Sequence, residues 1–205
     1  MSSDPRPLLA AALDQTGALV HGVRSDQLDL PTPCAEYDVR LLEAHLLGVL
    51  GRIAHVGAGG APFDVPSLVE GVADVPAAWD AARLRLEKVW SDDGVLDRVL
   101  RAPWGGVPGR ALALGYTQEV LTHAWDLAVS TSQRDLLDDA LAAAALNGVE
   151  SRVPASPRGE RIPFGPVVPV PPEASAYERL VGWLGRDPAP WSAAPGRSAA
   201  ERNRS

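Results

Sequence analysis

The segment that decides the fold is Arg110–Ser130, with the sequence RALALGYTQEVLTHAWDLAVS. Its apolar residues recur at intervals of three and four, which predicts a long amphipathic helix. The predicted inward face of this helix also carries Tyr116, Glu119 and His123. An unpaired carboxylate on such a face costs several kcal/mol, and a bound metal ion would neutralise the charge of Glu119.

Similar periodicity predicts further helices on both sides of this segment. They are expected at about residues 5–23, 38–53, 76–90 and 135–153, with a short helix at 175–184. Amphipathic helices bury their apolar stripes against one another, and a bundle is the simplest arrangement that does so. We therefore expect an all-α protein, namely a four-helix bundle with an additional helix and a Pro-rich C-terminal extension.

Proline- and glycine-rich stretches predict where one part of the chain ends and the next begins. Residues 5–153 are expected to form the helical bundle, and 154–188 a Pro-rich connector with a short helix that packs on it. Gly185 is expected to end that helix in the left-handed conformation. Residues 189–205 are expected to be a disordered tail. Within the bundle, the interval Val95–Val107 predicts two short extended pieces around a turn.

Composition excludes several classes of partner and site. The 19 basic and 26 acidic residues give a net charge of −7, which argues against nucleic acid and against an anionic membrane surface. No apolar run is long enough to span a membrane. The single cysteine, Cys34, excludes an internal disulfide and any multi-cysteine metal site, and it favours a reducing, cytoplasmic location. Monomer and homodimer both stay open.

Three side chains have the types and positions of a mononuclear metal site. Glu119 and His123 are spaced i, i+4, so they lie on one helix face, one turn apart. His45 lies on the predicted inward face of a different helix. Two imidazoles and a carboxylate suit zinc, and also nickel, iron, cobalt or manganese, and three ligands leave coordination positions open for catalysis. The alternative is a solvated Glu–His pair and a core histidine.

Five further residues have two interpretations each. Asp126 either orients a metal-bound histidine or is an ordinary solvated or capping carboxylate. Tyr116 and Trp104 either line a pocket or pack in the core. Cys34 is either a reactive thiol or a small core residue. Arg186 either binds an anionic group or simply follows the end of a helix.

The order of motifs resembles a known family. Thr32-Pro33-Cys34 is followed by Tyr37-Asp38 and His45, and later by Glu119, His123 and Trp125-Asp126, with Gly185-Arg186-Asp187-Pro188 near the end. This order is similar to that of metal-binding proteins related to mycothiol-dependent maleylpyruvate isomerase, within the DinB-like superfamily. The resemblance implies a DinB-like four-helix bundle in which His45, Glu119 and His123 hold a divalent ion, usually zinc. Tyr37 departs from the family pattern, where tryptophan is more usual.

The resemblance also implies a function. A bound ion would activate a small-molecule thiol, and mycothiol is the thiol implied as co-substrate. The expected reaction is transfer of the thiol sulfur to a small electrophile, or thiol-assisted isomerisation of that electrophile. Two alternatives stay open at this point: a non-catalytic helical module that binds a metal or ligand, and a structural bundle without metal.

Overall fold

The computed structural model describes residues 4–103, 105–150, 152–156, 158 and 164–192. Within these ranges the chain is mostly helical, as predicted. Its α-helices are α1 (Arg6–His21), α2 (Val39–Gly57), α3 (Val75–Trp90), α4 (Gly109–Ser130), α5 (Asp139–Glu150) and α6 (Ala176–Trp183). The predicted extended pieces form a short antiparallel hairpin of β1 (Val99–Ala102) and β2 (Gly105–Pro108). Trp104 lies outside the described residues.

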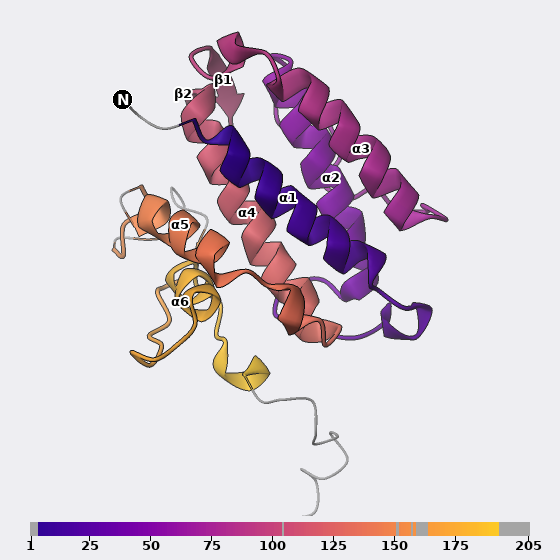
Figure 1. Cartoon of the computed structure of the whole chain (residues 1–205), viewed down its shortest axis with the longest axis vertical. Helices are drawn as coiled ribbons and strands as arrows, with labels where there is room; N and C mark the ends of the chain where they lie inside the picture. The colour runs from indigo at the N-terminus through magenta and orange to yellow at the C-terminus, as the bar shows by residue number, and fades with distance from the viewer. Residues whose placement is uncertain (1–3, 104, 151, 157, 159–163, 193–205) are drawn as a thin grey trace, which may run out of the picture.

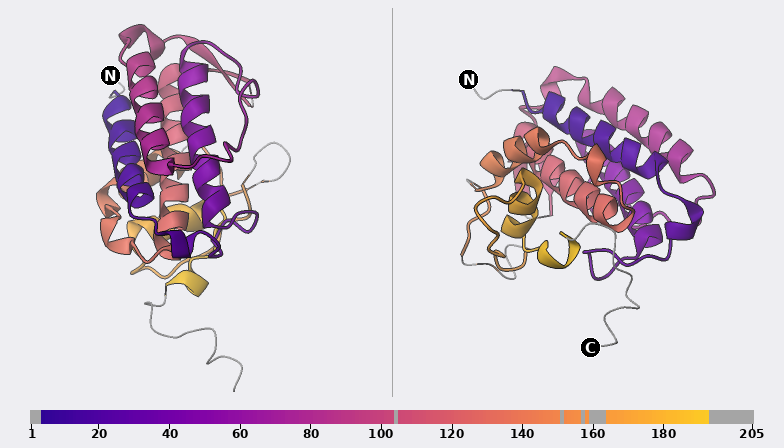
Figure 2. Two further views of the ribbon diagram at one scale, coloured as in Figure 1. Left: turned by 90° about the vertical axis from the view of Figure 1, so that its right-hand side faces the viewer. Right: turned by 60° about the horizontal axis from the view of Figure 1, so that its bottom comes forward.

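The four longest helices pack side by side, and we call α1–α4 the helical body (Figures 1 and 2). Helix α1 contacts α3 and α4, and helix α2 contacts the same two helices. The apolar faces that meet between them are fully buried, as at Leu13, Leu46, Leu50 and Leu121. The body thus places α2 directly against α4, which brings together the two helices that carry the predicted metal ligands.

Helix α4 differs from the sequence expectation in how it is buried. The prediction gave it one inward face, but every residue from Val120 to Ser130 is buried. The reason is that α1 and α2 contact α4 from the body, while α5 and α6 contact it as well. A helix covered on several sides needs no polar face. Polar residues within this stretch therefore need partners inside the protein.

The element boundaries follow local capping. Helix α2 begins after Asp38, whose carboxylate accepts a hydrogen bond of 2.8 Å from the Leu41 N–H, as predicted for its N-cap. The same helix continues to Gly57, beyond the predicted end. The fifth helix begins at Asp139 rather than at Asp135, because Arg134–Leu136 form a separate 3-10 turn and Asp138 accepts a hydrogen bond from the Ala140 N–H.

Helices α5 and α6 contact each other and α4, and we call them the C-terminal pair. Helix α6 starts with a capping box in which Ser175 and Glu178 bond each other's backbone N–H groups. Gly185 follows α6 with φ +91°, which confirms its predicted left-handed conformation. No helix among the described residues is long and apolar enough to cross a membrane.

The expectation of a disordered tail from residue 189 is wrong for its first residues. Ala189–Trp191 form a 3-10 turn, and the half-buried Trp191 packs against the core. The Ser192 hydroxyl lies 2.7 Å from the Glu178 carboxylate and 2.9 Å from the Pro188 carbonyl, and its single proton can be donated to either acceptor. Trp191 supplies apolar surface to bury, and the expectation of a disordered tail did not take this residue into account. The rest of the predicted tail, residues 193–205, lies outside the described residues.

Candidate metal centre

His45 lies on α2 with its ring held from one side by a backbone carbonyl. The His45 Nδ1 atom is 3.1 Å from the Ser67 carbonyl oxygen. A carbonyl oxygen can only accept, so Nδ1 carries the proton and Nε2 has a free lone pair. The ring is buried, with 9% of the residue exposed. His45 therefore leaves the lone pair of Nε2 free of a hydrogen bond to the Ser67 carbonyl.

The segment that supplies this carbonyl is fixed to α2 at two points. The Val69 N–H donates a 3.0 Å hydrogen bond to the Ala44 carbonyl. The Ser67 backbone also lies so close to Gly48 that a Cβ atom there would be 2.5 Å from the Ser67 oxygen. Glycine at position 48 thus permits the close approach that orients His45.

His123 lies on α4 and is oriented by a carboxylate. Its Nδ1 atom is 3.0 Å from Asp126 Oδ2, one turn further along the helix. Asp126 is fully buried and also accepts two hydrogen bonds of 3.2 Å from Nε and Nη2 of Arg186. Because the carboxylate accepts from Nδ1–H, the His123 Nε2 atom is also left free. Asp126 thus occupies the position expected of a residue that orients a metal-bound histidine.

Glu119 lies at the open edge of this group. Its Oε1 atom is 3.9 Å from His45 Nε2 and 3.6 Å from Arg52 Nη1. The Glu119 side chain is 31% exposed, so it is less deeply inward than its helical position predicted. The neighbouring cation that its charge required is Arg52, which the sequence argument did not identify. Arg52 lies seven residues after His45, a spacing that places both on one face of α2.

The two histidine rings touch, although they come from different helices. Their centroids are 4.8 Å apart and the rings meet edge to face, at 76°. The Tyr37 ring also contacts the His45 ring, with 5.1 Å between the two ring centroids. Burial, and after it the charge of the neighbouring His123, lowers the pKa of His45 to about 4. The imidazole of His45 is therefore neutral near pH 7, which is the form that binds a metal.

The predicted trio of His45, Glu119 and His123 does not bring three ligand atoms within 4.8 Å of one another, but another set of side chains does. Among the described residues, donor atoms of Cys34, His123 and Asp126 lie within 4.8 Å of one another. The turn that places Cys34 there is organised by Thr32, whose hydroxyl accepts from the Cys34 N–H and donates to the Tyr37 carbonyl. Burial raises the pKa of the Cys34 thiol, so the neutral thiol is favoured. Asp126 already serves both His123 and Arg186.

Tyr116 is buried, whereas the two remaining histidines of the chain lie at the surface. Tyr116 is buried one turn before Glu119, and its hydroxyl has no hydrogen-bond partner among the described residues. His21 and His55 are on the surface, where they pair with Asp80 and Asp64. The Ser67 carbonyl left no signal in the sequence, because any residue supplies a carbonyl.

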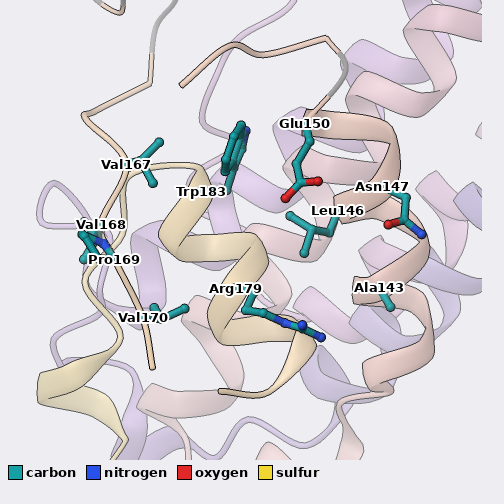
Figure 3. Close-up of a pocket in the computed structure, with 10 residues that line it drawn as sticks. All are labelled: Ala143, Leu146, Asn147, Glu150, Val167, Val168, Pro169, Val170, Arg179 and Trp183. Carbon is teal, nitrogen blue, oxygen red and sulfur yellow. The ribbon is translucent and has the colours of Figure 1, made fainter. Parts of the chain in front are cut away.

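A separate cavity of about 350 Å³ lies between α5, α6 and the segment 167–170 (Figure 3). Its walls are about as polar as they are apolar, because the apolar Trp183 is accompanied by the charged side chains of Glu150 on α5 and Arg179 on α6. None of the predicted site residues lines it. The candidate metal centre is therefore a feature of α2 and α4, distinct from this cavity.

Comparisons with known proteins give a family and relatives of unknown activity. The family described as Mycothiol maleylpyruvate isomerase N-terminal domain matches residues 9–128. Two relatives, both uncharacterised proteins from strains of Mycobacterium tuberculosis, are 35% identical over 182 residues, which is 88% of this chain and 97% of each relative. No solved structure was found to match. The family match covers His45, Glu119, His123 and Asp126, but it ends before Arg186.

Proposed function

The chain belongs to the family of the mycothiol maleylpyruvate isomerase N-terminal domain, and from that premise we propose that it is a metal-dependent enzyme that uses mycothiol. The reaction is transfer of the thiol sulfur to a small electrophile, or isomerisation of that electrophile with the thiol as helper. The helical body would be a DinB-like four-helix bundle. Its ligands to the ion are His45, Glu119 and His123.

The observation that carries the proposal is that the Nδ1 atom of each histidine has its own hydrogen-bond partner. Each histidine donates through Nδ1, one to the Ser67 carbonyl and the other to Asp126, so both keep Nε2 for an ion. The Glu119 carboxylate faces His45 Nε2 across 3.9 Å. Two ligand atoms at about 2.0–2.2 Å from one tetrahedral ion are about 3.4 Å apart, so the carboxylate would have to move inward by about 0.5 Å. Two neutral imidazoles and one carboxylate suit zinc, and also nickel, iron, cobalt or manganese.

The alternative grouping of Cys34, His123 and Asp126 fits a metal less well. Asp126 would have to exchange its bonds to Arg186 and His123 for the ion. The Cys34 thiol would have to ionise although burial raises its pKa. We therefore assign Asp126 to the orientation of His123, and we give Cys34 no ligand role.

A divalent ion, when bound, lowers the pKa of a thiol so that a thiolate nucleophile exists near neutral pH. The chain's own contribution is orientation. Ser67 and Asp126 fix the tautomers, Arg186 holds Asp126, and Tyr37 packs against the His45 ring. The unpaired hydroxyl of Tyr116 is available to donate a hydrogen bond to a bound group.

In the addition step, sulfur forms a bond to an electrophilic carbon and the π electron pair of a conjugated C=C bond moves onto its neighbours. The proton lost from the thiol is balanced by protonation of that displaced pair. For isomerisation, rotation about the resulting single bond and loss of the thiol regenerate the C=C bond with the other geometry. Neither outcome requires an external oxidant or reductant.

The test combines metal content and turnover, on protein purified without a metal-affinity tag. We expect near-stoichiometric metal in the wild type and loss of it in His45→Ala and Glu119→Ala. His55→Ala is the matched control, because His55 lies on the same helix but pairs with Asp64 at the surface. Mycothiol should then be consumed with at least one of a panel of conjugated electrophiles, and this consumption should be lost with the metal.

Two results would count against the proposal in different ways. A wild-type protein without metal, or one whose metal survives both substitutions, removes the metal centre. Metal that behaves as expected but with no mycothiol consumed across the panel favours the non-catalytic binding module instead.

A further inference from the structure

Two opposite charges line the cavity between α5, α6 and the segment 167–170. Glu150 lies on α5 and Arg179 on α6. Neither side chain has an ion pair or a hydrogen bond to a described residue, and the two do not pair with each other. A carboxylate accepts hydrogen bonds and a guanidinium donates them. The cavity therefore offers two separate contacts, one for a cationic group and one for an anionic group of a ligand.

The two charges lie at different levels along the cavity. Figure 3 shows Glu150 near the end occupied by Trp183, whereas Arg179 lies towards Ala143. Arg179 and Trp183 are four residues apart on α6, which corresponds to a rise of about 6 Å. A hydrogen bond of about 2.8 Å at each end covers most of such a distance. A ligand whose own charges are only a few bonds apart can therefore contact both side chains.

The space between the two charges has apolar walls. Leu146 is drawn between Glu150 and Arg179 in Figure 3, and the three valines of the segment 167–170 line the cavity as well. The volume of about 350 Å³ is near the lower end of the range of about 300–1,000 Å³ that is usual for small-molecule sites. The cavity thus suits a small ligand that has an apolar part beside its charged groups.

Both the tryptophan wall and the valine wall are fixed by contacts outside the cavity. The Trp183 indole N–H donates a 3.0 Å hydrogen bond to the Val153 carbonyl, and the Arg158 guanidinium lies 5.7 Å from the centre of the indole ring. The Val168 N–H donates a 2.9 Å hydrogen bond to the Gly182 carbonyl. A Cβ atom at Gly182 would lie 2.8 Å from the Val168 oxygen, so glycine permits this close approach. The cavity is therefore pre-formed, as binding sites for small molecules usually are.

We propose that this cavity binds a small α-amino acid with an apolar side chain. Its carboxylate contacts Arg179, its ammonium group contacts Glu150, and its side chain packs among Leu146 and the valines. The cavity lies outside residues 9–128, the part of the chain that the family match covers, and no proposed metal ligand lines it. The proposal is therefore independent of the proposed function.

The charges of the cavity favour a zwitterion over a simple anion or cation. A carboxylic acid without an amino group leaves Glu150 opposite an apolar group, and an amine without a carboxylate does the same to Arg179. Arg179 is the one basic residue among the described residues that line the cavity. A phosphate dianion would place a second negative charge near Glu150, and like charges repel. The cavity should therefore discriminate against both kinds of singly charged ligand and against phosphate.

The first experiment titrates metal-free full-length protein with leucine by calorimetry, in the presence of a chelator. The chelator is needed because an amino acid can itself bind a metal ion. Isocaproate is leucine without its amino group, and isoamylamine is leucine without its carboxylate. We expect leucine to bind roughly tenfold or more tightly than either compound, which is the effect of one charged hydrogen-bonded contact.

Two variants assign each end of the ligand to one side chain. Arg179→Gln should weaken leucine binding roughly tenfold or more and leave isoamylamine binding unchanged. Glu150→Gln should weaken leucine binding by a similar factor and leave isocaproate binding unchanged. Arg85→Gln is the control, since Arg85 is exposed on α3 and does not line the cavity. Circular dichroism of each variant checks that the helices are intact.

The second experiment locates the bound amino acid by NMR of the tryptophan indole N–H groups. The signal of Trp183 is identified as the one that is absent in Trp183→Phe. Leucine should shift this signal in the wild type, and the shift should need a higher leucine concentration in Arg179→Gln.

Several results would overturn the proposal. Leucine, valine and phenylalanine might all fail to bind, isocaproate or phosphate might bind as tightly as leucine, or leucine affinity might be the same in wild type, Arg179→Gln and Glu150→Gln. Leucine that binds without shifting the Trp183 signal would place the amino acid elsewhere. Metal content and mycothiol consumption test the proposed function separately, so either proposal can fail while the other stands.

Discussion

The helical body and the C-terminal pair contribute to the candidate centre in different ways. The body supplies every proposed ligand, from two helices that are in direct contact. The C-terminal pair contributes a cation, Arg186, which lies just beyond α6. Its guanidinium donates two hydrogen bonds to the fully buried Asp126 on α4. The family match covers residues 9–128 and so includes the ligands but not this cation. The proposed ligands and the cation that holds the orienting carboxylate of Asp126 thus come from separate parts of the chain.

This division indicates which part determines which property. Loss of a ligand in the body should remove the ion, whereas changes in the pair should alter how firmly His123 is held. Because α5 and α6 also pack on α4, the two parts should unfold together rather than separately. The predictions below test these statements in order of decreasing effect.

The largest effect is expected from core truncation in either part. Leu50 on α2 and Leu180 on α6 are both fully buried. Replacing either with alanine should lower the free energy of unfolding by about 2–5 kcal/mol, in a single urea transition. Leu84→Ala is the control, since that side chain is 67% exposed. A Leu180→Ala protein whose body unfolds at the wild-type urea concentration would show that the two parts are independent.

A smaller effect is expected where the two parts meet. Arg186→Gln leaves Asp126 buried with only His123 as a partner, and it should cost about 1–3 kcal/mol of stability. Zinc affinity should fall, by up to roughly 10–100-fold, because the orientation of His123 is weakened. Competition with a zinc-binding dye measures the second quantity. Arg179→Gln, on the exposed side of α6, should change neither quantity, and unchanged zinc binding in Arg186→Gln would contradict the role given to this contact.

The last substitution tests the packing that orients His45, with a cost in stability similar to that of Arg186→Gln. Gly48→Ala places a Cβ atom 2.5 Å from the Ser67 oxygen, so the backbone around Ser67 must move. We expect it to cost about 1–3 kcal/mol and to weaken zinc binding. Gly51→Ala, one turn along the same helix, meets nothing within 4 Å and should instead stabilise the protein by about 0.5–1 kcal/mol. Equal effects of the two substitutions on unfolding would refute the packing argument.

The sequence predicted what depends on local periodicity. The helices containing His45 and His123 were expected where they occur, and the spacing of Glu119 and His123 on one turn follows from helix geometry. The position of Asp126, three residues after His123, was enough to suggest its contact with the imidazole. These features follow from positions within one helix.

The sequence did not predict what depends on tertiary packing. The Ser67 carbonyl that fixes His45 has no side-chain signature, and its approach depends on the absence of a Cβ at Gly48. The bond between Arg186 and Asp126 joins residues 60 positions apart, so periodicity carries no information about it. Arg52 was detectable in principle, because it shares a helix face with His45, but a charged residue on a helix is usually a solvated one.

The most direct test of the account is the coordination of zinc in the full-length protein, measured by X-ray absorption at the zinc edge. The account predicts two imidazole nitrogens at about 2.0–2.1 Å, an oxygen shell at about 2.0–2.2 Å, and no sulfur in the absence of mycothiol. The spectrum should be unchanged in Cys34→Ser and lost in His45→Ala. A sulfur shell at about 2.3 Å that disappears in Cys34→Ser would contradict the account, because the ion would then lie among Cys34, His123 and Asp126.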